Sequence, residues 1–353
     1  MLLAAAHETG LVDALEAALP GDLPADNSRR QHKDPGCRRA LLLTLLFLPA
    51  VGLRRTRDLR GYTGDALGLL TGRTHAYSYR HLERFLSAVA RADGAERLTE
   101  AIAGWTARLW QPGLRVVADR PPAYYADGHR KAVHSERLIP RGLVSRYGKV
   151  LGCWALMLLH DERGHPLLAT THRGDTHLTS GLPQILKLYE RAAGQDCVRR
   201  LVIDREGMAA EFLASLAENG RDVVTVLRSN QYTGKESFTG VGTFMPLSWD
   251  REGNVTREVA PAACSLSLPS HPGESLDLHV ALVRDLRRPV PCSEPQDRPS
   301  TPHADYADSP SWFDNGWIAT PAPVVPTEPA LVPIVTTARE FDPVELAMAY
   351  THR

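Results

Sequence analysis

The sequence predicts an α/β protein in which a mixed sheet with helices follows an all-helical N-terminal region and precedes a β-rich segment. Three observations lead to this prediction. Apolar residues recur at helical spacing through the first part of the chain, and apolar runs alternate with amphipathic segments in the middle. Polar and apolar residues then alternate, a pattern typical of antiparallel strands. We expect regions at 1–110, 111–231, 232–338 and 339–353.

The N-terminal region is expected to consist of several short helices. Leu11, Leu15 and Ala18 share one face of the first helix, which Pro20 closes, and a polar loop follows at 22–36. An arginine-rich surface and glycine-punctuated turns are compatible with a helix-turn-helix type module and equally with a plain bundle. The other expected helices cover residues 37–48, 54–62, 65–70 and 78–91.

The middle region is expected to alternate strands with helices. A short strand ends at Asp127, and a hairpin follows around the turn at 161–164. A second strand ends at Asp204, directly before a helix. This order suits a mixed sheet with helices. The expected strands are 123–126, 149–160, 166–171, 200–203 and 222–227, and the expected helices are 180–193 and 207–219.

The C-terminal part is expected to be β-rich and irregular. Strands are predicted at 255–260, 264–268, 276–285 and 331–337, separated by a long proline-rich and poorly ordered loop at 289–329. Asp342 and Pro343 form a good N-cap and first-turn pair for a final helix that reaches Arg353.

Asp127 and Asp204 are the candidate metal ligands. Carboxylates at the ends of neighbouring strands can meet at one edge of a sheet, where oxygen ligands suit Mg²⁺ or Mn²⁺. Metal ions there activate a water or a 3′-hydroxyl for phosphoryl transfer. An aspartate between a strand and a helix is also a common N-cap, and this alternative stays open for Asp204.

Three segments together resemble a known family. YYADGHRKAV, VLGCWALMLLHDERGHPLLATTHRGDTH and RLVIDREGMAAEFLASLAENGRDVVTVLRSNQY look like the catalytic core of a bacterial DDE transposase. The resemblance implies a ribonuclease H-like fold with a β-rich insertion. It also implies metal-dependent hydrolysis of phosphodiester bonds and strand transfer at transposon ends. Double-stranded DNA, as transposon ends and target, is the implied partner, and a homodimer on DNA is the implied assembly.

The branch that this chain resembles carries a Y-x2-R-x3-E-x6-K signature on the final helix. Tyr350 and Arg353 match its first half, and the resemblance implies that they contact DNA near the cleavage site. The glutamate of the signature, the third catalytic acid, would stand four residues beyond Arg353. Glu345 lies about 18 Å away from that place along a helix, too far to replace it. We therefore expect an insertion-sequence transposase truncated before its third acid and inactive as this chain.

The charge distribution favours a polyanionic partner. The chain has 41 basic and 41 acidic residues, yet between Arg29 and Arg80 eleven basic residues face three acidic ones. Such a block indicates either DNA contact or a solvated surface. Together with the resemblance, it makes the helical region the expected DNA-binding region, in which the candidate DNA-binding residues are Arg54, Arg55, Arg57 and Arg60.

The compartment and the alternatives follow from the remaining features. Five scattered cysteines without a C-x-x-C pair, no apolar run near ~20 residues and an acidic start predict a cytoplasmic protein. The resemblance implies that this protein is associated with the bacterial nucleoid. A non-catalytic DNA-binding or inhibitory remnant of a transposase is the main alternative function. A metal-dependent hydrolase that acts on another substrate is a third, and the arginine distribution counts against it.

Overall fold

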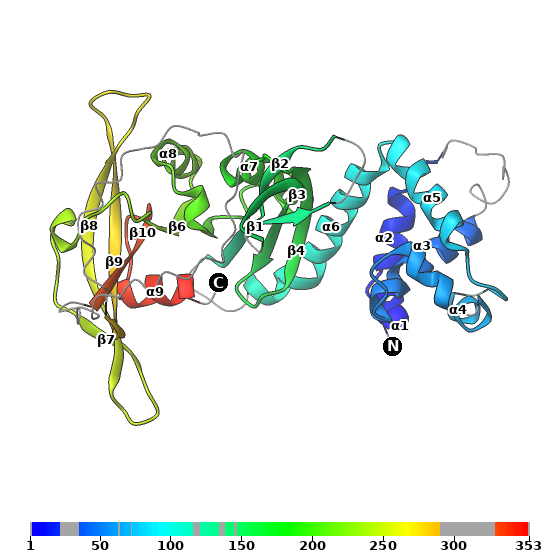
Figure 1. Ribbon diagram of the computed structural model, residues 1–353, viewed down its shortest axis with the longest axis horizontal. Coiled ribbons are helices and arrows are strands. Elements are labelled where there is room, and N and C mark those ends of the chain that lie inside the picture. The colour runs from blue at the N-terminus through cyan, green and yellow to red at the C-terminus, as the bar shows by residue number, and fades with distance from the viewer. Residues whose placement is uncertain are drawn as a thin grey trace, which may run out of the picture. The chain divides into compact units, whose positions relative to one another are not determined.

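The computed structural model describes residues 2–21, 35–62, 64–71, 73–115, 121–133, 138–144, 147–289 and 329–351 (Figure 1). Two compact units divide this chain. The first runs to Val223 and the second extends from Val224 to Thr351. The predicted boundary at 110 falls inside a helix of the first unit, and the one at 231 falls shortly after the start of the second. Most of the loop expected at 289–329 lies outside the described residues.

Helices form the N-terminal part of the first unit. Ser78 caps one of them by accepting a hydrogen bond from the backbone N–H of His81, and its buried stripe includes Leu82, Phe85 and Val89. This stripe packs into one apolar core with residues of the preceding helices. The elements are α1 (Leu2–Glu8), α2 (Leu11–Ala18), α3 (Pro35–Ala50), the 3₁₀ helix η1 (Thr56–Gly61), α4 (Gly64–Leu70), α5 (Tyr79–Arg91) and α6 (Gly94–Arg115).

A mixed sheet with helices forms the rest of the first unit. Strand β3 (Lys149–Asp161) pairs antiparallel with β1 (Ala123–Ala132) on one side. On its other side it pairs antiparallel with β2 (Arg141–Val144) and β4 (Pro166–Arg173). Strand β5 (Arg200–Ile203) runs parallel to β1. This confirms the predicted α/β class with a mixed sheet, and the arrangement is compatible with a ribonuclease H-like fold.

Two longer helices and one short 3₁₀ turn accompany this sheet. Helix α7 (Leu178–Ala193) packs against the face that carries Tyr124, whose ring meets that of Tyr189 edge-on at 6.0 Å between centroids. The 3₁₀ turn η3 (Arg205–Gly207) directly follows β5, and α8 (Ala210–Glu218) leads to β6 (Asp222–Val226). The segment after Asp204 is thus more irregular than the single helix expected at 207–219.

The second unit is an antiparallel sheet with one helix against it. Its strands follow the order β6, β10 (Pro329–Thr336), β9 (Ser275–Pro289), β8 (Val255–Ser267) and β7 (Met245–Trp249). A 3₁₀ turn, η4 (Lys235–Ser237), lies between β6 and β7 in the chain. Two strands were expected at 255–260 and 264–268. The structure has one strand there, β8, because its residues from Arg257 to Ser267 pair with β9 without a break.

The final described helix belongs to the second unit. Asp342 accepts a hydrogen bond from the backbone N–H of Val344 at 2.9 Å, which fits its predicted capping role. Helix α9 (Pro343–Thr351) then buries Leu346 and Ala347 against the sheet of β8, β9 and β10. Arg353 lies outside the described residues.

Candidate active site

The parallel pairing of β1 and β5 brings the two predicted acids side by side. Ala126 is paired with Ile203, the last residue of β5, and Asp127 and Asp204 directly follow these two residues in the chain. Neighbouring strands lie about 4.8 Å apart, so the backbones that carry the two carboxylates are adjacent. The geometry expected from two strand ends is therefore present, although their catalytic role stays a prediction.

The structure corrects the expectation that the first strand ends at Asp127. Strand β1 continues to Ala132, because β3 remains paired with it as far as Cys153. Only the pairing with β5 stops at Ala126. Asp127 thus lies where one neighbour of β1 ends and the other continues, on a backbone that the sheet still holds.

Backbone hydrogen bonds orient both carboxylates. Asp127 is exposed, and its Oδ1 accepts from the N–H of Gly128 at 2.9 Å. Asp204 is half-buried, and its Oδ1 accepts from the N–H of Arg205 at 2.7 Å. Asp204 is therefore also the N-cap of η3, as the alternative interpretation held.

A group of charged side chains near the two aspartates was not predicted from the sequence. Glu206, two residues after Asp204, accepts a hydrogen bond and ion pair from Arg130 at 3.0 Å. His177, the N-cap of α7, lies 3.7 Å from the same carboxylate oxygen. No spacing rule in the sequence connects Glu206 with an arginine on β1.

Strand geometry places this group on the opposite face of the sheet from Asp127. Successive side chains of a strand point to opposite faces, so Gly128 and Arg130 share one face of β1 and Asp127 lies on the other. A Cβ atom on Gly128 would lie 3.8 Å from Glu206 Oε2 and 3.9 Å from Leu178, the first residue of α7. Glu206 thus belongs to the α7 face and does not extend the aspartate pair.

The Glu206–Arg130 pair cross-links the two segments that carry the aspartates. Arg130 stands three residues after Asp127, and it also donates to the backbone oxygens of Gly174 and Thr176, in the loop before α7. Both side chains of the ion pair are about one quarter exposed, so water screens the pair only in part. The pair therefore holds β1, η3 and this loop in one arrangement.

Oxygen donors are the ligands available for a metal at the aspartate edge. Mg²⁺ is commonly bound by one or two carboxylates together with water or phosphate oxygens, which fits Asp127 and Asp204. Among the residues that the structure describes, no group of three or more His, Cys, Asp or Glu side chains could hold a metal ion. The metal stays a prediction supported by the donor type.

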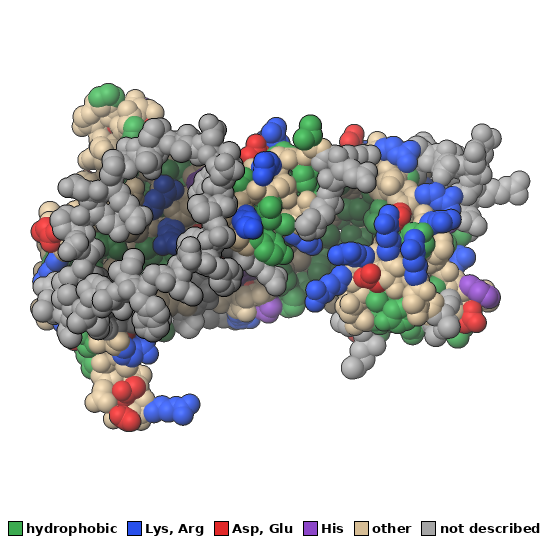
Figure 2. Space-filling model, in the orientation of Figure 1, with side chains coloured by type: hydrophobic (Ala, Val, Ile, Leu, Met, Phe, Trp, Pro, Cys, Tyr) green, Lys and Arg blue, Asp and Glu red, His purple; other side chains and the backbone are tan. Residues whose placement is uncertain are grey.

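The four candidate arginines are all exposed, on or beside η1. Leu59 of η1 is buried in the core of the helical part. The arginines of this turn therefore face outward. Arg57 forms an ion pair with Glu83 of α5 at 3.2 Å, and Arg60 lies over the ring of Tyr79. On the face shown in Figure 2, several Lys and Arg side chains of this helical part lie close together.

The remaining predicted DNA contacts lie in or near the final helix. Tyr350 is half-buried on α9, in the second unit, whereas Asp127 and Asp204 belong to the first. Arg353 is outside the part of the chain that the structure describes. Nothing in the geometry of α9 by itself assigns Tyr350 a role.

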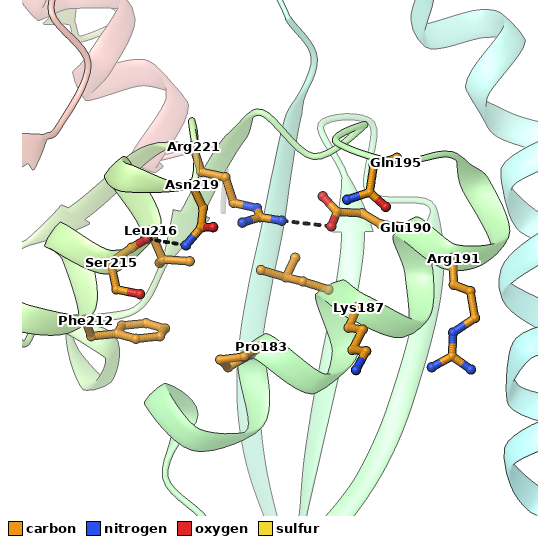
Figure 3. A pocket seen from close by; sticks show the side chains of 11 residues that line it. Pro183, Lys187, Glu190, Arg191, Gln195, Phe212, Ser215, Leu216, Asn219 and Arg221 are labelled. Carbon is orange, nitrogen blue, oxygen red and sulfur yellow. Dashed lines mark hydrogen bonds and ion pairs between the residues drawn. The ribbon is translucent and has the colours of Figure 1, made fainter.

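A cavity of about 460 Å³ lies between α7 and α8 (Figure 3). Its wall includes the ion pair of Glu190 and Arg221, whose N–O distance is 2.8 Å and whose side chains are largely buried. Leu186, Phe212 and Leu216 give it an apolar side. None of the predicted site residues lines this cavity, so it is separate from the aspartate edge.

Comparisons with known proteins give little similarity. No family model matches the chain, and no curated protein is detectably similar to it. Among solved structures, it is similar to the piggyBac transposase in a cryo-EM synaptic complex with hairpin DNA, at 11% sequence identity and a TM-score of 0.34. The match covers 98% of this chain and 55% of that one. A similarity at this level does not establish a shared fold.

Hydropathy adds one further observation. Within the described residues, no helix combines the length and the apolar character that a membrane span requires.

Proposed function

We propose that this protein is a DNA transposase of the DDE class. Asp127 and Asp204 are its metal ligands, Mg²⁺ is its cofactor with Mn²⁺ as a substitute, and the arginines on and beside η1 hold DNA. One observation carries the proposal: the parallel register of β1 and β5 sets the two aspartates side by side at the point where β5 ends. The motifs around both residues resemble the transposase core and support the same assignment.

In this proposal the aspartates hold the metal ion and the arginines hold the DNA. Asp127 and Asp204 present carboxylate oxygens that are oriented by the N–H groups of Gly128 and Arg205. When bound there, Mg²⁺ would supply Lewis-acid stabilisation of the phosphoryl group under attack and lower the pKa of a water. Exposed arginines would bind the phosphates of double-stranded DNA, which positions the strand without reading its sequence.

The finer assignment belongs to the same proposal. It is an insertion-sequence transposase of the Y-x2-R-x3-E-x6-K type that acts as a homodimer on transposon ends and target DNA. Tyr350 and Arg353 then contact DNA near the cleavage site. This assignment is supported by sequence motifs alone.

Nicking of supercoiled plasmid tests the proposal. The chain is incubated with plasmid in Mg²⁺, in Mn²⁺ and in EDTA, and any nicking is expected to require a metal ion. Because the signature glutamate would stand four residues beyond Arg353, the assay is repeated with a version that carries the residues encoded next in the reading frame. Nicking by neither version, with DNA binding intact, would favour the non-catalytic DNA-binding or inhibitory remnant.

The DNA-binding part has its own prediction. Replacing Arg54 and Arg55 by Gln is expected to lower the slope of log affinity against log salt by about 2, because each phosphate contact contributes ~0.9 on duplex DNA. Fluorescence anisotropy with a labelled duplex measures this slope. The matched control replaces Lys187 and Arg191, two exposed basic residues of α7, by Gln. Equal slopes for the two double variants would remove Arg54 and Arg55 from the interface.

A further inference from the structure

A small cavity lies in the helical part of the first unit, where η1, α4 and the start of α5 meet. Its volume is about 190 Å³. Buried Leu59, Leu67 and Tyr77 form its floor, whereas Tyr62 at its rim is 49% exposed. Arg60, Ala76 and Tyr79 also line it. The cavity therefore has an apolar floor and a polar, aromatic rim.

Guanidinium groups lie over the aromatic rings of this wall. Arg60 stands 4.3 Å from the ring centre of Tyr79, and Arg73 stands 4.0 Å from that of Tyr77. Arg60 and Arg80 both donate hydrogen bonds to the Tyr79 hydroxyl. These bonds, that of Arg80 first, lower the pKa of the Tyr79 phenol below its ordinary value. The rings are thus held in place and surrounded by positive charge.

The inner tyrosine and the two outer tyrosines of this cavity differ in what they can offer a ligand. Tyr77 is 6% exposed and donates its hydroxyl hydrogen to the Cys37 carbonyl, so it serves the core. Tyr62 and Tyr79 stand at the opening, the first exposed and the second half-buried. Exposed aromatic faces beside arginines are the surfaces on which nucleobases stack, whatever their sequence.

The size of the cavity limits what can enter. Sites for drug-sized ligands usually measure ~300–1,000 Å³, so about 190 Å³ suits a single flat ring system. Arg54, Arg55 and Arg57 are exposed on or next to η1, the element that also supplies Arg60 to the rim. A phosphate backbone bound by these arginines would pass beside the opening.

We propose that this cavity accepts one unpaired nucleobase of the bound DNA, which stacks between Tyr62 and Tyr79 and is enclosed by the apolar floor. This inference rests on the proposed DNA-binding function and adds a base-binding subsite to it. A base reaches such a site from a single strand, or after leaving the stack of a duplex. Stacking is sequence-tolerant, so the site distinguishes unpaired from paired or missing bases.

Three probes test the proposal on the full chain by fluorescence anisotropy: oligothymidylate, an abasic oligodeoxynucleotide of the same length, and a duplex. Oligothymidylate is expected to bind about 5- to 100-fold more tightly than the abasic strand, because base–aromatic stacking contributes ~1–3 kcal/mol. Ala76→Trp, which fills the cavity, and Tyr62→Ala, at the exposed rim, are each expected to reduce this preference at least fivefold. Abasic and duplex binding should not change.

Controls separate the possible failures. Tyr147→Ala removes a similarly exposed tyrosine elsewhere in the first unit and is expected to keep the preference. Thermal melting verifies that each variant is folded, and Tyr62→Ala is the decisive one should Ala76→Trp unfold. Equal affinity of the wild-type chain for oligothymidylate and the abasic strand would overturn the cavity proposal while salt-dependent duplex binding stands. Failure to bind any probe would overturn the proposed function itself.

Discussion

Asp204→Asn is expected to reduce Mg²⁺-dependent plasmid nicking by about 10²–10³-fold in whichever version of the chain nicks DNA, since metal ions contribute several kcal/mol to such reactions. The substitution keeps the size of the side chain and an oxygen that can accept from the N–H of Arg205, so η3 keeps its cap. It removes the negative charge that a divalent cation needs. Asp127→Asn is expected to have a similar effect, because the two residues stand next to each other in the register.

Metal binding gives a readout that does not depend on catalysis. Mn²⁺ binding, followed by electron paramagnetic resonance, is expected to weaken at least ~10-fold in either variant. Asp196→Asn is the matched control. Asp196 is exposed and has a φ of 54°, a conformation that asparagine tolerates well. Unchanged Mn²⁺ affinity and unchanged nicking in Asp204→Asn would remove this residue from the mechanism.

Glu206→Gln is expected to weaken Mn²⁺ binding by about 10–100-fold although Glu206 lies on the other face of the strand. Groups that orient metal ligands typically contribute this much to affinity. Glu206 is a positioning residue: its ion pair with Arg130 ties the segment after Asp204 to the strand that carries Asp127. Without the charge on Glu206, the two aspartates are less well held relative to each other.

A variant of a second ion pair in the same unit distinguishes an effect on metal binding from an effect on stability. Glu190 and Arg221 form a closer and more buried pair than Glu206 and Arg130, so Glu190→Gln should lower the melting temperature at least as much. It should leave Mn²⁺ affinity unchanged, because neither residue contacts the aspartate edge. If Glu206→Gln lowered only the melting temperature, its role would be structural. Partial rescue of Mn²⁺ affinity by Arg130→Glu combined with Glu206→Arg would support the cross-link.

Local patterns were sufficient to predict most elements, and they single out the two aspartates, whose role stays a prediction. The helix that contains Leu82, Phe85 and Val89 follows from the 3.6-residue period of its apolar side chains and from the cap at Ser78. Both signals lie in residues that are close together in the sequence. The same holds for the short strand before Asp204. The end of β1 was mispredicted because it depends on pairing with β3. The paired residues of β3 all lie more than 20 positions away in the sequence. No local pattern encodes how far that pairing continues.

The sequence by itself therefore determined the α/β class and the order of its elements, and it singled out the two acids as candidates. Tertiary structure alone decided that Asp127 and Asp204 are adjacent, because the parallel register of β1 and β5 brings together residues 77 positions apart. It also decided that Arg130 meets Glu206, and that three short elements enclose a cavity around Tyr62 and Tyr79. These features arise from contacts between distant segments, which depend on packing of the whole unit rather than on any local period.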